Sequence, residues 1–442
     1  MAVYFLTPFM GSALVTSIAD IGIELSMGVN AAGSIISAYV LSTAAFLLPV
    51  SKISDAFGYL RTLFFGALLF LCTTALCGFA VNGHMLISMR LIEGFAASMI
   101  FCSGMTLISL HFPPEERGKA MGMITFMVYS GLSLGPMIGG YLNSRFGWRS
   151  IFWFGIALTL FVLVFFVTRR LPFEKIKKVN FDIYGMVFYF LATSLFFAGF
   201  SVQSAYGALL ALSGVAMYAV FFFHEKKQSD PLLDVNLLKT NRVFVMSSVS
   251  SLLNYMAASA VLFLVSMELR ISFGYETTHI GLVLLAQSLA MTITAPLAGR
   301  YSDRHPDSRI ASAGMAVIAV MLFLMSVTSG VDNPYMLAGL QFCIGVGFGM
   351  FAPSNNKVIM NSVEKRYYST ASSVLASMRL YGQILSIGLS VMVISLIAGK
   401  VKVEHLSPDK LTHSLKAVFL MYCAISIVGV FTSLFRKNKA GE

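Results

Sequence analysis

Charged residues are scarce in this sequence, and their scarcity excludes an ordinary soluble protein. Only 12% of the 442 residues are Asp, Glu, Lys or Arg, against about 25% in a typical soluble domain. No polar stretch is long enough to form a soluble ATPase domain, which excludes a pump driven by such a domain. The five cysteines form no CxxC pair, so we expect neither a metal site nor a disulfide framework.

Patterns of catalytic residues are missing as well. The sequence has no HExxH motif, no cluster of metal ligands and no glycine-rich nucleotide loop between a strand and a helix. We therefore predict that the protein is not an enzyme and that it has no metal or organic cofactor.

Long apolar runs are abundant, and each is sufficient to cross about 30 Å of hydrocarbon as a helix. They predict an all-α integral membrane protein. The fourteen predicted spans cover residues 1–23, 30–51, 62–81, 84–110, 118–142, 150–168, 182–200, 205–223, 243–268, 277–299, 309–328, 334–356, 368–398 and 415–435.

The net charge of +11 comes from basic residues in short loops between these runs. Cytoplasmic loops of membrane proteins are rich in Lys and Arg, and an even number of spans leaves both termini on one side. We therefore expect a multi-pass protein of the cell membrane (plasma or inner membrane) with both termini in the cytoplasm, and we expect no binding to nucleic acid.

Two parts of the chain repeat each other. SKISDAFGYLR (51–61) matches GRYSDRHPDSR (299–309), and PPEERGKA (113–120) matches SVEKRYYS (362–369), with similar offsets. The repeat predicts a six-helix bundle over 1–168 and a second over 243–442. Residues 169–242 then form a two-helix insert with its flanking cytoplasmic linkers.

The matching segments 51–61 and 299–309 each place an aspartate and basic residues in a tight turn. An aspartate there can bind the end of a neighbouring helix and stabilise one conformational state; the alternative is a simple basic cytoplasmic loop. We call the residues of this predicted cytoplasmic latch the latch residues, and they are Asp55, Gly58, Arg61, Asp303, Arg304 and Arg309.

The fourth predicted span carries Arg90 and Glu93, three residues apart on one helical face. Charges within the hydrocarbon are costly and face a cavity or a partner. This pair is either a site of proton coupling or a purely structural ion pair.

The fifth span contains GLSLGPMIGG (131–140). Gly131, Gly135 and Gly139 recur every four residues, so they form a stripe on which another helix can pack closely. Pro136 favours a kink, and Gly140 extends the small-residue surface. Ordinary close packing of two membrane helices is the alternative interpretation.

Taken together, these motifs resemble those of the major facilitator superfamily. The loop resembles its G-x-L-a-D-r-x-G-r-r-r signature, the fourth span its arginine motif linked to proton coupling, and the fifth its antiporter signature g-x-x-x-G-P-x-x-G-G. DIYG (182–185) and APSNNKVIMNSV (352–363) are similar to the fourteen-helix branch of drug:proton antiporters. The resemblance implies the major facilitator fold, with two pseudo-symmetric bundles plus two inserted helices.

The first span departs from that branch, which usually has an acid early in this helix. Asp20 lies instead near the outer mouth, where it is either a coupling acid or an ordinary interfacial acid. In the second half, polar residues within or at the ends of spans are candidates for the substrate pathway, with Glu268 a candidate counter-ion for Arg379. These candidates are Asn254, Glu268, Gln287, Gln341, Arg379 and Gln383.

The resemblance implies a secondary transporter that exports amphipathic drugs in exchange for protons by alternating access. Its partners would be small amphipathic molecules, protons and the lipid bilayer, with the proton gradient as driving force, and we expect a monomer. A specific metabolite exporter of the same fold and a non-transporting membrane sensor remain as alternatives.

Overall fold

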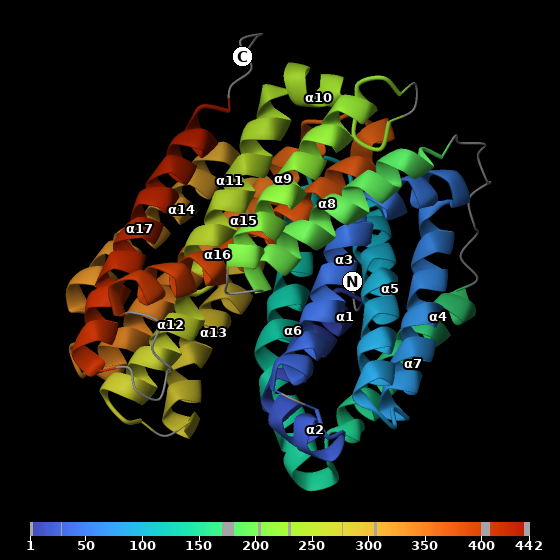
Figure 1. Cartoon of the computed structure of the whole chain (residues 1–442). Coiled ribbons are helices and arrows are strands. Elements are labelled where there is room, and N and C mark those ends of the chain that lie inside the picture. The colour runs from blue at the N-terminus through green and yellow to red at the C-terminus, as the bar shows by residue number, and fades with distance from the viewer. Residues whose placement is uncertain are drawn as a thin grey trace. The chain divides into compact units, whose positions relative to one another are not determined.

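A computed structural model shows a chain of helices joined by short connections (Figure 1). It describes all residues except 1–2, 28, 170–180, 202–204, 229–230, 276, 305–306, 399–406 and 437–442. Within these described ranges the chain contains no β-strand. The five cysteines are free thiols.

By its internal contacts the chain divides into two compact units. Unit 1 comprises Met1–Phe112, Met127–Lys239 and Glu364–Ser377, and unit 2 comprises Pro113–Phe126, Thr240–Val363 and Met378–Glu442. Two long helices, α6 (Arg117–Phe146) and α16 (Tyr368–Ala398), each contribute their first turns to one unit and the remainder to the other.

Unit 1 contains the helices of the first part of the chain. They are α1 (Val3–Ser12), η1 (Val15–Ser17), α2 (Ile18–Glu24), α3 (Val29–Phe57), α4 (Tyr59–Gly78), α5 (Gly83–His111), α7 (Arg149–Arg169), α8 (Ile183–Ser201), α9 (Ala205–Glu225), most of α10 (Val235–Thr240), and the short η3 (Lys365–Tyr367). The hairpin of α8 and α9 packs on α3, where the Tyr189 hydroxyl donates to the Ala44 carbonyl at 3.3 Å.

Unit 2 contains the helices of the second part. They are α11 (Arg242–Ala258), α12 (Val261–Met267), the π-helical turn η2 (Glu268–Ser272), α13 (Thr277–Ser302), α14 (Asp307–Thr328), α15 (Pro334–Asn361) and α17 (Pro408–Leu434). Inside this unit α15 packs extensively on both α13 and α14, and α17 packs on α14 and α11.

Polar side chains at the ends of apolar runs determine where several helices begin. Asn82, Asn241, Asn333 and Ser407 each accept a hydrogen bond from the backbone N–H three residues later. Such a cap satisfies one of the N–H groups that have no partner in the first turn of a helix.

Twelve helices among the described residues are long and apolar enough to cross a membrane. Two of the fourteen predicted spans, 1–23 and 182–200, correspond to shorter apolar helices at Val3–Ser17 and Ile183–Gly199. The first is short because the α-helix ends at Ser12 and a 3₁₀ turn follows at Val15–Ser17. At 1.5 Å per residue, such helices are close to the minimum length of a span.

Candidate functional site

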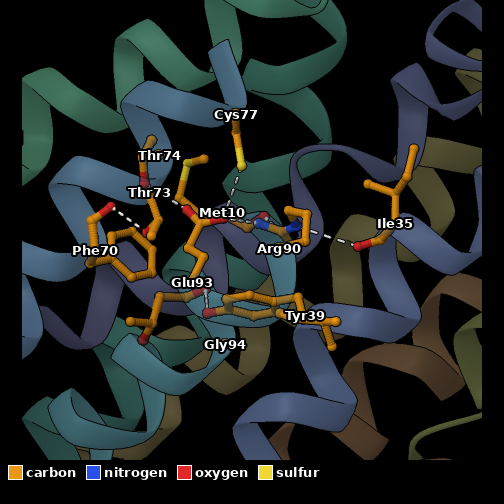
Figure 2. Close-up of polar contacts among 12 residues, drawn as sticks. Met10, Ile35, Tyr39, Phe70, Thr73, Thr74, Cys77, Arg90, Glu93 and Gly94 are labelled. Carbon is orange, nitrogen blue, oxygen red and sulfur yellow. Dashed lines mark hydrogen bonds and ion pairs between the residues drawn. The ribbon is translucent and has the colours of Figure 1, made fainter. Parts of the chain in front are cut away.

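Arg90 and Glu93 form a fully buried ion pair on α5 (Figure 2). The Nη1 atom of Arg90 lies 2.6 Å from Oε2 of Glu93, and neither side chain is exposed. A buried ion pair is tolerated only when further hydrogen bonds satisfy both partners, because desolvation of the two charges is costly. The surroundings of each group therefore decide what the pair can do.

The carboxylate of Glu93 is bound on both of its oxygens. The Thr74 hydroxyl of α4 donates to Oε1 at 2.6 Å, while Arg90 and the Cys77 thiol, whose sulfur is 3.9 Å away, donate to Oε2 (Figure 2). Donors from α4 and α5 therefore occupy both oxygens of the Glu93 carboxylate.

The Arg90 guanidinium connects three helices. Its Nε donates to the Ile35 carbonyl of α3 at 3.4 Å, and Nη2 donates to the Met10 carbonyl of α1 at 3.5 Å. The Tyr39 ring lies 4.2 Å from Cζ, so the cation is also stabilised by an aromatic face (Figure 2). Arg90 thus links the charge of Glu93 to the positions of α1 and α3.

Gly94 allows this arrangement because it permits a close approach of α3 and α5. A Cβ atom at Gly94 would clash with the Tyr39 carbonyl and lie 2.8 Å from the Ser42 Cβ. Because Gly94 has no side chain, Tyr39 can lie over the guanidinium of Arg90, which is one turn earlier on α5.

The glycine stripe of α6 packs against α1. A Cβ at Gly131 would lie 2.5 Å from the Phe5 carbonyl oxygen, one at Gly135 would clash with Ser12, and one at Gly139 with the Ala13 backbone. At Gly140 the nearest atom would be 3.7 Å away. The helix continues through Pro136.

Helix α1 therefore contacts the glycine stripe and the buried charge at the same level. The Met10 carbonyl accepts from Arg90, and the neighbouring Phe9 carbonyl lies 3.1 Å from the position of a Cβ at Gly135. The buried charge and the glycine stripe therefore contact neighbouring residues of α1.

In unit 2, the latch residue Asp303 binds the N-terminus of α6. Its carboxylate accepts the backbone N–H of Gly118 at 2.8 Å and that of Lys119 at 2.9 Å. The Nζ atom of Lys357, on α15, lies 3.1 Å from Oδ1 of Asp303. An anion at a helix N-terminus is favoured by the unpaired N–H groups and the helix dipole. Arg304 is exposed, and Arg309 is exposed on α14.

In unit 1, the latch residue Asp55 accepts hydrogen bonds from two hydroxyl groups. Its Oδ1 accepts from the Tyr59 hydroxyl at 2.7 Å and from the Ser369 hydroxyl, at the start of α16, at 2.5 Å. Gly58 has φ +94° at the junction of α3 and α4, which a side chain would disfavour. Arg61 is partly exposed and donates to the Phe57 carbonyl at 3.4 Å.

Sequence reasoning missed Lys357 and Ser369. The signal for Ser369 was present, because the repeat aligns residues 362–369 with 113–120, the segment that Asp303 binds. Since Asp303 binds segment 113–120, the repeat predicts that Asp55 contacts segment 362–369, which contains Ser369. Lys357 lies one residue beyond the predicted span 334–356, where a basic residue is ordinary, but helix α15 continues to Asn361.

Asp20 and Glu24 of unit 1 are exposed and have partners. Asp20 accepts from the Asn143 amide at 2.5 Å. Glu24 accepts from Trp148 Nε1 at 2.6 Å and pairs with Arg149, and these hydrogen bonds lower the pKa of Glu24 below its ordinary value.

The predicted substrate-pathway residues of unit 2 differ in their partners. Glu268 accepts from the Gly330 N–H at 2.8 Å, whereas its predicted pairing with Arg379 stays a prediction. Arg379 and Gln383 are partly exposed on α16. The side chains of Asn254, Gln287 and Gln341 are buried, and each has polar atoms without a partner in the described structure.

Twelve helices among the described residues are long and apolar enough to cross a membrane, and a charged pair is fully buried on one of them. The family model described as Major Facilitator Superfamily matches residues 1–223 and 247–442. The chain belongs to this superfamily. Its members are transporters, so the chain is a multi-pass membrane transporter and not an enzyme.

Several characterised proteins are similar over most of this chain. The riboflavin transporter RibZ of Clostridioides difficile is 27% identical over 377 residues, which cover 85% of this chain and 82% of that protein. The methylenomycin A resistance protein of Bacillus subtilis is 27% identical over 390 residues, covering 86% and 83%. The multidrug resistance protein Stp of Mycobacterium tuberculosis is 26% identical over 396 residues, covering 86% and 72%.

Among solved structures, the human organic anion transporter MFSD10 has a similar fold. The TM-score is 0.69 with 14% identity, and the match covers 98% of this chain and 97% of that chain. At this identity the likeness concerns the fold alone.

Proposed function

We propose that this transporter exports small amphipathic molecules in exchange for protons, from the cytoplasm across the cell membrane, as a monomer with both termini cytoplasmic. The observation that carries the proposal is the buried Arg90–Glu93 pair with its hydrogen bond to α1. The names of the Stp and methylenomycin A relatives support export of toxic compounds.

Protonation of Glu93 is the coupling step in this proposal. A neutral Glu93 leaves the Arg90 guanidinium buried without a counter-charge, which is unfavourable in a low-dielectric interior. Arg90 then seeks other acceptors, and its bonds to the Met10 and Ile35 carbonyls rearrange. Because α1 also contacts the glycine stripe of α6, this rearrangement would bias the equilibrium between access states.

We also propose that the two shorter apolar helices cross the membrane, giving the fourteen spans of the drug:proton antiporter branch. Their lengths are near the minimum for a span, and the α8–α9 hairpin packs against α3 of unit 1. Attachment of a membrane-impermeant thiol reagent to single cysteines introduced at both ends of α8 would test this topology.

The test of coupling uses purified protein in proteoliposomes with a fluorescent amphipathic substrate. Wild-type protein should accumulate substrate in response to an imposed pH gradient and should also exchange substrate at equal pH. Glu93→Gln keeps the shape and one acceptor oxygen but cannot ionise, so it should retain exchange and lose the response to the gradient. Retention of the gradient response by Glu93→Gln would remove Glu93 from the coupling step.

An exporter of one specific metabolite is the second candidate. It is favoured by the similarity to RibZ, named a riboflavin transporter. Competition among unrelated compounds separates the two, because a multidrug exporter is inhibited by many of them and a specific exporter by close analogues.

A further inference from the structure

Three carboxamide side chains in unit 2 are buried and incompletely hydrogen-bonded. Asn254 on α11 and Gln341 on α15 are 0% exposed, and Gln287 on α13 is 3% exposed. Both polar atoms of Asn254 and of Gln341, and the Oε1 of Gln287, have no partner among the described residues. An unmet buried polar group costs about 1–3 kcal/mol, so three together require a reason.

Helix packing brings Gln287 and Gln341 to one level of the unit. A Cβ at Gly345 would clash with the Gln287 carbonyl and lie 2.7 Å from the Ala290 Cβ, so α13 and α15 cross at this point. Gln341 precedes Gly345 by four residues, on the same face of α15.

Helix α11 brings Asn254 to the same region. The rings of Tyr255 and Phe348 lie edge to face with centroids 5.1 Å apart, which joins α11 to α15. Phe348 is seven residues after Gln341 and shares its face of α15. Asn254 shares a face of α11 with Ser247, seven residues earlier, whose carbonyl accepts from the Asn355 amide of α15 at 3.1 Å. The three amides and this aromatic pair therefore occupy the region where α11, α13 and α15 meet.

The three amides are neutral, and Arg379 lies on a helix that packs against α11. Helix α16 packs on α11 with the Tyr255 Cβ 2.6 Å from the position of a Cβ at Gly382, and Arg379 lies one turn earlier on α16. The buried acid of unit 2, Glu268, accepts from the Gly330 N–H. The groups available for recognition are neutral donors and acceptors.

We infer that Asn254, Gln287 and Gln341 form a recognition site for an uncharged, flat heterocycle whose edge carries both N–H and C=O groups. Carboxamides pair with such an edge because each offers two donors and one acceptor oxygen. The Tyr255–Phe348 pair supplies an adjacent aromatic surface for the ring. This inference rests on the proposed transport function and specifies the substrate class.

Three fluorescent flat molecules of different charge test the inference. They are lumiflavin, which is neutral with an imide edge, flavin mononucleotide, which is anionic, and ethidium, which is cationic. Binding to purified wild-type protein is measured by fluorescence titration, and transport is measured in proteoliposomes. Lumiflavin should bind most tightly, and 3-methyllumiflavin, whose imide N–H is blocked, should bind about three- to tenfold more weakly.

Two variants locate the site. Gln341→Leu and Asn254→Leu remove the amides at similar volume, and each should weaken lumiflavin binding about three- to tenfold. Ser414→Ala is the matched control, because its buried hydroxyl already donates to the Lys410 carbonyl within α17. A thermal melt of each ligand-free variant confirms folding, and the leucine variants should melt no lower than wild type since they remove unpaired polar groups.

Each result has a distinct meaning. Transport and tight binding of ethidium without lumiflavin binding would overturn the neutral-heterocycle inference and leave the export function standing. Preferred binding of flavin mononucleotide would overturn it in favour of an anionic ligand. Lumiflavin binding unaffected by both leucine variants would refute the assignment of residues. If folded protein neither bound nor moved any of the three, the inference and the proposed function would both fail.

Discussion

The carboxylate of Asp303 accepts the backbone N–H of Gly118 at 2.8 Å, although 185 residues separate them. The equivalent residue in the first repeat, Asp55, accepts instead from the hydroxyl of Ser369. Each repeated loop thus reaches the first turn of a helix from the other part of the sequence. Asp303 also accepts the backbone N–H of Lys119, and the Lys357 ammonium lies 3.1 Å from its carboxylate.

The Asp303 contact should stabilise the packing of the α6 N-terminus in unit 2. Asp303→Asn removes a charge from that helix N-terminus and from the contact with Lys357, so we expect a loss of about 1–2 kcal/mol and a lower melting temperature. Arg304→Gln, at an exposed position, is the control. A melting temperature of Asp303→Asn equal to that of Arg304→Gln would contradict this role.

Removal of one partner of the buried ion pair should be more harmful than removal of both. Arg90→Ala leaves Glu93 buried without its cation, and we expect a destabilisation of about 3–5 kcal/mol. The double variant Arg90→Met with Glu93→Leu replaces both charges by apolar groups and should recover most of the melting temperature.

The same double variant separates a coupling role from a structural one. If the pair couples protons to transport, the folded double variant should not respond to a pH gradient in proteoliposomes. A gradient response at the wild-type level would show that the pair is purely structural.

The glycine stripe offers a matched pair of substitutions. Gly139→Ala adds a methyl group that clashes with the Ala13 backbone. The methyl group of Gly140→Ala would lie 3.7 Å from its nearest neighbour, the Thr16 hydroxyl oxygen. We expect Gly139→Ala to lower stability by about 1–3 kcal/mol and to impair transport, since backbone of α1 must move. Gly140→Ala should behave as wild type in melting and transport assays. Equal melting temperatures and equal transport for Gly139→Ala and Gly140→Ala would mean that α1 does not pack on the stripe in the membrane.

Stability should depend on pH through Glu24. Hydrogen bonds from Arg149 and Trp148 lower the pKa of Glu24 from its ordinary value of 4.5. A lowered folded-state pKa adds stability above pH 4.5 that is lost as pH falls through the lowered value. Wild type should therefore melt slightly higher than Glu24→Gln at pH 7, and the difference should shrink below pH 4.5. The effect is small because both side chains are partly exposed, and a difference that grows in acid would contradict the assignment.

Much of the organisation could be predicted from the sequence because its causes are local. Apolar runs of sufficient length predict spanning helices wherever they occur, and twelve such helices are present among the described residues. Likewise, three residues between Arg90 and Glu93 place them on one helical face whatever surrounds the helix. The other two predicted spans, 1–23 and 182–200, correspond to shorter apolar helices, and hydrophobicity alone did not show that the first α-helix ends at Ser12.

Contacts between distant segments were decided by the tertiary structure. The sequence by itself determined a membrane-spanning helical transporter family, its internal repeat, and which polar residues lie within apolar helices. Only the tertiary structure decided that Asp303 binds the α6 N-terminus, that Arg90 reaches α1, and that Glu93 is bound by Thr74. The physical reason is that helix formation and membrane insertion depend on neighbouring residues along the chain. The partner of a buried polar group depends instead on which helices pack within hydrogen-bonding distance, and those helices are brought together by contacts such as those at Gly94 and Gly139.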